Sequence, residues 1–327
     1  MPDGVSKGAV LSRSDAPARK KAGAHNLHAT GSEKLLAHLA MLCFAAIIAG
    51  SFSIGGLVAP YLDPRALNGA RFILGVAVMS GVVFATYGRI PRPPGGLRGS
   101  WRYALMGGLM ATYFVLMFAA LQIAKPVSTG AMFTLIPLMS AGFGWLFLRQ
   151  TTRAIVLVSL LVAAAGSLWV IFHGDLDALL GFRIGKGEAI FFFGCIAHAA
   201  YAPLVRKMNR GEPVLVFAFF NLVGIMVWIV MSGIREIFAT DWATLPGMVY
   251  LGIVYLSLMA TVLTFILLNF ASMRLPASKV LSYGYLTPVF IILYEGMIGH
   301  GWETLSVMAG ALVTAAALLI MALAPDA

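Results

Sequence analysis

The stretch "SYGYLTPVFIILYEGMIGHG", residues 282–301, contains the features that decide the fold class. It is almost wholly apolar, yet it carries a proline, Pro288, and a single carboxylate, Glu295. A proline inside a helix removes a backbone hydrogen bond and bends the helix. An acidic side chain in lipid costs insertion free energy. The two together are typical of a membrane helix that breaks beside an internal cavity, rather than of a soluble core segment.

The composition of the whole chain indicates the same environment. Of 327 residues, 60% are hydrophobic and only 11% are charged, whereas about a quarter of an ordinary soluble domain is charged. The apolar residues form blocks of about 20, the length that crosses a bilayer. We therefore predict an all-α integral membrane protein with ten transmembrane helices. The expected spans are residues 35–58, 66–87, 102–122, 127–148, 154–173, 187–206, 213–233, 246–271, 277–299 and 303–323.

The segments between and before these spans define the domains. Residues 1–34 are polar and basic, which predicts a disordered cytoplasmic tail. Two five-helix units follow, at residues 35–174 and 186–323. The two cysteines, Cys43 and Cys195, each stand alone in an apolar block, so we expect neither a disulfide nor a metal site, and no cofactor.

Charge indicates the orientation of the chain. When the connections are assigned alternately to the two sides, most Lys and Arg residues fall on the side of the N-terminus, and acidic residues favour the other side. Because basic residues concentrate in cytoplasmic loops, both termini are expected in the cytoplasm, with the protein in the cell (inner) membrane. Topology and attraction to lipid then explain the net charge of +10, and no nucleic-acid partner is expected.

Ten spans divide into two halves of five, and an odd number forces the halves into opposite orientations. Residues 131–150 and 282–301 occupy the fourth span of each half, and aligning them places Pro137 opposite Pro288. Inverted repeats with matched helix breaks surround a central site in many transporters. We therefore predict that both prolines break or hinge their helices beside a central cavity.

At these residues the chain resembles the drug/metabolite transporter superfamily, specifically the ten-helix type with two EamA domains. The resemblance includes "GSFSIGG" (residues 50–56), "LNGARFILG" (67–75) and "ASMRLPASKVLSYGYLTPV" (271–289), and Arg71 matches an Arg early in the second helix of that family. It implies a transporter related to bacterial exporters of amino acids and other metabolites. Gln150 and Gly301 stand where the family often has Glu.

Two charged residues are expected inside the membrane. Glu295 and Arg71 lie at similar depths, roughly 6 to 8 Å from the outer ends of their helices at 1.5 Å per residue. They either pair with each other across the cavity mouth or extend separately to the lipid headgroups. Glu295 is also the candidate for gating or for coupling transport to protons.

Polar and aromatic residues near midspan are the candidates for lining the cavity. Their rings and hydroxyls suit an amphipathic solute with an apolar body and a polar end. His198 has an alternative role, a hydrogen bond to a neighbouring helix. The candidate cavity residues are Ser51, Phe52, Tyr113, His198, Tyr201, Tyr283 and Tyr285.

These patterns favour a secondary transporter that exports small amphipathic metabolites by alternating access, with aromatic or large neutral amino acids as the substrates that the resemblance implies. Drug efflux and nucleobase or vitamin transport stay open as alternatives. An intramembrane enzyme is disfavoured because no HExxH or GxSxG motif occurs, and no Walker A motif indicates ATP hydrolysis. The expected partners are the small-molecule substrate and the bilayer, with the chain a monomer or weak oligomer.

Overall fold

The computed structural model describes residues 32–93, 95–149, 151–272, 274–275, 280 and 282–323. The first helix, α1, begins at Ser32, so residues 32–34 belong to the helix and not to the predicted tail. The rest of that predicted tail, residues 1–31, lies outside the described residues.

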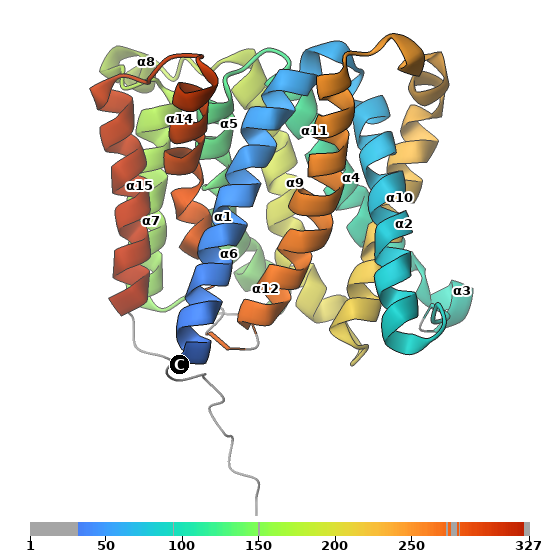
Figure 1. The fold of residues 1–327 in the computed structure, drawn as a ribbon. Coiled ribbons are helices and arrows are strands. Elements are labelled where there is room, and N and C mark those ends of the chain that lie inside the picture. The colour runs from blue at the N-terminus through green and yellow to red at the C-terminus, as the bar shows by residue number, and fades with distance from the viewer. Residues whose placement is uncertain are drawn as a thin grey trace, which may run out of the picture.

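The chain folds into an all-helical bundle (Figure 1). Among the described residues, eight helical segments are long and apolar enough to cross a membrane, and two shorter apolar segments complete the expected ten spans. We call the end of the bundle where α1 begins and α15 ends the terminal face, and the opposite end the distal face. The spans are α1 (Ser32–Val58), α2 (Pro64–Tyr87), α4 (Trp101–Leu121), α5 and α6 (Pro126–Phe133 and Ile136–Leu148), α7 (Ala154–Ile171), α9 (Lys186–Met208), α10 (Val214–Ala239), α11 and α12 (Gly247–Ser257 and Thr264–Ser272), η4 and α14 (Tyr283–Leu286 and Thr287–Ile298), and α15 (Leu305–Leu323).

The outer surface of the bundle is apolar at mid-height, as a lipid environment requires. Large side chains such as Phe193, Met231 and Leu251 are between 65% and 72% exposed. In water such exposure would cost hydrophobic free energy, whereas lipid tails are as apolar as the side chains. The short helices α3 (Gly96–Gly99) and α8 (Leu176–Leu180) lie in the connections at the two faces (Figure 1).

Local sequence signals explain where a typical span begins and ends. Asp63 accepts a hydrogen bond from the backbone N–H of Arg65, and Pro64 occupies the first position of α2. Asp63 thus satisfies one free N–H group of the helix start, and Pro64 has no N–H to satisfy. The helix ends at Tyr87 and is followed by Gly88, whose φ of 66° is left-handed, a conformation that glycine adopts at little cost.

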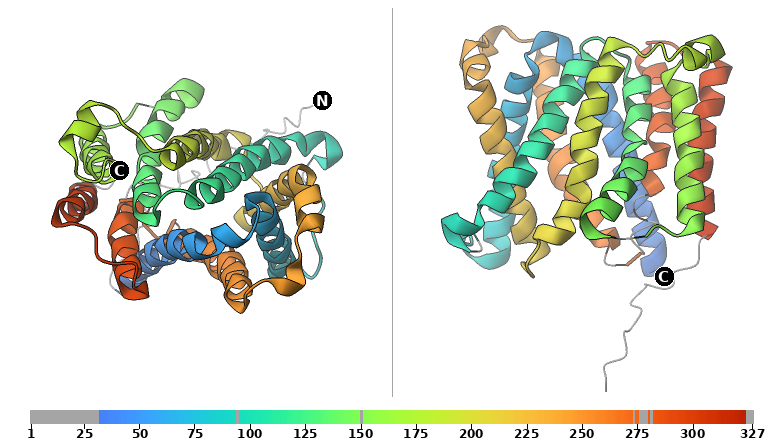
Figure 2. Two further views of the ribbon diagram at one scale, coloured as in Figure 1. Left: turned by 90° about the horizontal axis from the view of Figure 1, so that it is seen from above. Right: turned by 180° about the vertical axis from the view of Figure 1, so that it is seen from behind.

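The packing of the spans follows a two-fold pattern. α2 packs on α10, and α7 packs on α15, so the second and fifth spans of each half contact their own counterparts (Figure 2). α4 packs on α9, and the equivalent third span of the second half, α11 with α12, packs on α1. This is the pairing that two inverted five-helix halves require.

In the part of the chain that the structure describes, three spans are interrupted away from their ends. α5 ends at Phe133 and α6 begins at Ile136, so Pro137 lies in the first turn of α6. In the second half, α14 begins at Thr287 after the 3-10 turn η4, and Pro288 takes the equivalent place. The structure thus breaks both helices at the positions of the matched prolines. A third interruption, the π-helical turn η3 (Leu258–Leu263) between α11 and α12, has no proline and was not expected from the sequence.

Candidate functional site

A cavity of about 230 Å³ lies between the two halves, beside the helix breaks. Six of the residues singled out in the sequence line it, one or more from each of six spans. They are Ser51, Arg71, Tyr113, Pro137, His198 and Tyr285. The wall also contains residues that the sequence analysis did not select, because apolar residues at these positions look the same as lipid-facing ones. These are Phe44, Ile48, Met110, Phe114, Met117, Phe133, Thr134, Ile136, Ala260, Leu268, Val280 and Gly284.

The other candidates lie outside this wall. Phe52 points into the packed core, where its ring contacts Phe133 and Phe191 with centroids 5.7 and 6.0 Å away. Tyr201 packs beside His198 at 6.3 Å without lining the cavity. Tyr283 lies nearer the terminal face and hydrogen-bonds His38 (2.7 Å).

Arg71 is the charged residue in the cavity wall, and its side chain is almost wholly buried, with 2% of the residue exposed. Its Nε and Nη2 both donate to the Thr261 hydroxyl, at 3.2 and 3.1 Å. The guanidinium lies over the Phe114 ring, 4.4 Å from the centroid, within the range of a cation–π interaction. Its third nitrogen, Nη1, is buried without a hydrogen-bond partner.

The π-helical turn holds Arg71 in this position. Thr261 lies within the turn and donates to the carbonyl of Leu256, five residues earlier. One turn away, Ser257 donates to the backbone carbonyl of Arg71 at 3.0 Å. π-turns inside α-helices occur frequently at functional sites. The hydroxyl residues within this apolar span are the sequence signal for such support, because the π-turn itself has no marker residue.

Of the two alternatives left open for Arg71 and Glu295, the mutual ion pair is not seen: within the described part of the chain each side chain bonds another residue. Glu295 instead bonds His300, with Oε2 2.7 Å from the ring Nδ1. Its side chain is 8% exposed, and Oε1 has no partner. Glu295 lies in the last turn of α14 near the distal face, and it does not line the cavity.

His198 contributes a second polar edge to the wall. Its ring packs against the Tyr113 ring with centroids 4.8 Å apart, and its Nδ1 is buried without a partner. The expected hydrogen bond to a neighbouring helix is therefore not made by this nitrogen. Two buried polar atoms that lack partners, Arg71 Nη1 and His198 Nδ1, thus belong to residues that line the same cavity.

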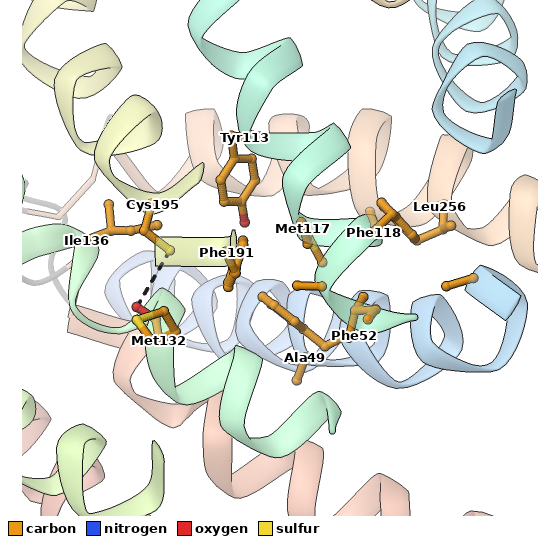
Figure 3. Packing of buried hydrophobic residues seen from close by; sticks show 14 of the residues in the cluster. Ala49, Phe52, Tyr113, Met117, Phe118, Met132, Ile136, Phe191, Cys195 and Leu256 are labelled. Carbon is orange, nitrogen blue, oxygen red and sulfur yellow. Dashed lines mark hydrogen bonds between the residues drawn. The ribbon is translucent and has the colours of Figure 1, made fainter. Parts of the chain in front are cut away.

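Tight apolar packing separates the cavity from the distal face. Phe52, Phe118 and Phe191 are fully buried in one cluster (Figure 3). Beyond them, Ser128 of α5 donates to Glu188 of α9 at 2.6 Å, and both residues are buried. Toward the terminal face the cavity wall includes Phe44, Leu268 and Val280, from the first, eighth and ninth spans.

The comparisons with known proteins agree with this architecture. The pattern of the EamA-like transporter family matches residues 35–172 and again residues 185–323. The chain belongs to the EamA-like transporter family. The family consists of transporters, so this chain is a multi-pass membrane transporter of the drug/metabolite superfamily and not an enzyme.

Two individual proteins are similar to this EamA-like transporter over most of its length. The "Uncharacterized transporter YyaM" of Bacillus subtilis (strain 168) is 23% identical over 278 residues, which cover 84% of this chain and 90% of that protein. A solved structure, described only as a crystal structure of a protein, superposes with a TM-score of 0.60 at 18% identity. That superposition covers 89% of this chain and 96% of the solved one, and it shows the same fold.

Proposed function

We propose that this secondary transporter exports small amphipathic metabolites through the central cavity by alternating access. The observation that carries the proposal is the cavity at the matched helix breaks, since its wall is mainly apolar and aromatic with a few polar groups. Binding sites for small organic solutes have this composition. Aromatic or large neutral amino acids are the first candidate substrates. Drugs, nucleobases and vitamins form the second group.

The orientation follows from charge. Described basic residues gather at the terminal face, among them Arg89, Arg92, Arg153 and Arg210. The positive-inside rule supports a cytoplasmic position for this face, and we propose that both termini lie in the cytoplasm and that the protein resides in the inner membrane. The aromatic cluster and the Ser128–Glu188 bond then close the cavity toward the outside.

Energy coupling in this proposal depends on Glu295. With its Oε1 unpaired and its Oε2 on His300, it is the candidate proton site or gate near the outer mouth. A facilitator needs no such group. Replacing Glu295 with Gln distinguishes proton coupling from facilitated transport. A proton-coupled transporter loses its response to an imposed pH gradient in this variant, whereas a facilitator shows no such response with either residue.

Uptake into proteoliposomes tests the function. Purified protein is reconstituted and given labelled phenylalanine, tyrosine, leucine, a nucleobase and a vitamin, with and without a pH gradient. We expect saturable uptake of at least one amino acid above protein-free liposomes. Uptake of the nucleobase or vitamin alone would replace the first substrate class with the second, and no flux of any solute by folded protein would contradict the proposal.

A further inference from the structure

Arg71 has hydrogen-bond donors without a partner, and these donors indicate which class of ligand the cavity binds. A guanidinium has five N–H donors, and Thr261 receives one from Nε and one from Nη2. The edge formed by Nη1 and the second N–H of Nη2 is left over, and Nη1 has no partner. Burying a charge without an opposite charge or hydrogen-bond acceptors nearby costs free energy. An anion bound in the cavity would provide the opposite charge and the acceptors.

The surroundings of Arg71 position this edge in advance. The Ser257 hydroxyl holds its backbone, the Thr261 hydroxyl holds one side of the guanidinium, and the Phe114 ring covers one face. Arg presents a planar pair of N–H groups that match the two oxygens of a carboxylate. A side chain already held by Thr261 and Phe114 loses little conformational entropy when such a ligand binds.

From this geometry we infer that Arg71 is the carboxylate-binding subsite of the cavity, and that the ligand is an organic monocarboxylate with an apolar, preferably aromatic, body. The inference rests on the proposed function, since it assigns a substrate class to the same cavity. A phosphate dianion fits less well, because Arg71 is the only permanently charged residue in the described wall.

The rest of the wall defines the other end of the ligand. Rings of Phe44, Phe114 and Phe133 face the cavity, and no Asp or Glu is among the described residues that line it. An ammonium group on the ligand therefore has no carboxylate to pair with. A deaminated acid is expected to bind at least as tightly as the amino acid of the same skeleton.

Four probes that share one skeleton test the inference: 3-phenylpropanoate, 3-phenylpropanamide, 3-phenylpropylamine and phenylalanine. Binding to the purified full chain in detergent is measured by isothermal titration calorimetry. We expect 3-phenylpropanoate to bind at least as tightly as phenylalanine, and at least tenfold more tightly than the amide or the amine, because hydrogen bonds to charged groups are the strong ones.

Variants assign this preference to Arg71. Arg71→Gln is expected to weaken 3-phenylpropanoate at least tenfold and leave the amide unchanged, and Arg71→Lys to restore part of the affinity. The matched control is Arg65→Gln in the same helix, because Arg65 is 39% exposed, pairs with Asp63 and Glu236, and does not line the cavity. Equal binding of acid and amide, unchanged binding in a folded Arg71→Gln variant, or no binding of 3-phenylpropanoate would each overturn the inference.

The two proposals fail in different ways. Flux of an amino acid in proteoliposomes, together with binding that ignores the carboxylate, would leave the transport function standing and remove the subsite. Arg71-dependent binding of 3-phenylpropanoate without flux of any solute would support the subsite and contradict the transport proposal.

Discussion

Thr261 shows how one uncharged residue can determine the position of a charged one. Its hydroxyl accepts from two nitrogens of Arg71, and removing it frees the guanidinium to rotate. We predict that Thr261→Val weakens binding of 3-phenylpropanoate several-fold while the charge is retained, as expected for a positioning residue. Binding of the amide analogue, which has no carboxylate to pair with the guanidinium, should be unaffected.

The matched control for this prediction is Thr264→Val. Thr264 is buried in the same span and donates to the carbonyl of Ala260, and it makes no bond to Arg71. Both variants lose one hydroxyl of the same span, but only Thr261→Val removes an acceptor of Arg71. Equal binding of the acid by the two variants would show that Thr261 does not position Arg71.

Glycine at position 107 permits the close approach of α4 and α10. A Cβ built there would lie 2.4 Å from the carbonyl carbon of Gly224, which is backbone and cannot move aside alone. We predict that Gly107→Ala destabilises the protein by about 1–3 kcal/mol, the usual cost of overpacking, and lowers the melting temperature.

Gly81→Ala is the control, because nothing lies within 4 Å of a Cβ at Gly81 in the middle of α2. There alanine should be neutral or stabilising by about 0.5–1 kcal/mol through helix propensity. Equal melting temperatures for the two variants would contradict the close approach of α4 and α10.

Residues differ in how far the sequence alone reveals them. Tyr113, His198 and Tyr285 could be selected for the cavity, since polar or aromatic residues inside apolar spans are conspicuous; Arg71 stood out for its charge but was expected at the cavity mouth. The partner of Arg71 could not, because a hydrogen bond between the second and eighth spans depends on how the helices pack. The same limit left two alternatives open for Arg71 and Glu295, a mutual ion pair or separate positions: equal depth permits contact but does not bring two helices together, and Glu295 bonds His300 instead.

At the scale of single elements, a buried ion pair fastens the start of α4 to the connection between α9 and α10. Arg102 donates to Glu212 at 2.7 Å, with side chains 1% and 7% exposed. Removing one partner of a buried pair leaves an uncompensated charge and costs about 3–5 kcal/mol. Glu212→Ala should therefore lower the melting temperature clearly at pH 7. Glu236→Ala should lower it little, because the Glu236–Arg65 pair is partly exposed.

The same pair predicts a pH dependence. Burial acts to raise the pKa of Glu212, but hydrogen bonds from Arg102 and from the backbone N–H of Arg210 outweigh burial and place that pKa below its ordinary value of 4.5. The contribution to stability is then fully present above pH 4.5 and is lost as the pH falls through the lowered pKa. The gap in melting temperature between the unmodified protein and Glu212→Ala should shrink below pH 4.5. A gap that stays constant down to pH 3 would contradict it.

Helix breaks also differ in how well the sequence predicts them. Pro137 and Pro288 mark their breaks because proline lacks the N–H that a helix needs. The π-turn of residues 258–263 contains only residues that ordinary helices tolerate, so it had no local signal. The cavity lies beside the two breaks that proline predicts, whereas the break without proline holds the charged residue of the cavity, Arg71.

At the scale of the whole molecule, the two halves carry similar polar contacts at opposite faces. Ser128 of α5 bonds Glu188 of α9 on the distal side, and Tyr283 of η4 bonds His38 of α1 on the terminal side. Each contact joins the first and fourth spans that meet there. In a transporter that alternates between states, breaking one contact should favour opening on its own face.

Labelling of a cysteine in the cavity tests this. With Cys43 replaced by Ala and a cysteine introduced at Ser51, we predict that Ser128→Ala increases labelling from the distal side at least severalfold, since the buried hydrogen bond to Glu188 is lost. Tyr283→Phe should not do so. Equal labelling with and without the Ser128–Glu188 bond would show that this contact does not hold the distal side closed.

The overall architecture was the part most accessible from the sequence. Ten apolar blocks and an odd number of spans per half dictate an inverted pair, and the family match supports two EamA units. The closure of the distal side could not be predicted from the sequence, because the packing of Phe52, Phe118 and Phe191 depends on how the two halves tilt. For the same reason Phe52 was expected in the cavity wall, whereas it lies in the packed core.

The most direct test of the central claim is whether blocking the cavity stops transport. In the Cys43→Ala background, the cysteine at position 51 is modified with a small methanethiosulfonate reagent, and uptake of labelled phenylalanine into proteoliposomes is measured. The control carries its cysteine at Thr112, next to Tyr113 but on the exposed side of α4. If solute passes through the cavity, modification abolishes uptake at position 51 and spares it at position 112. Full uptake after complete modification at position 51 would contradict a path through this cavity.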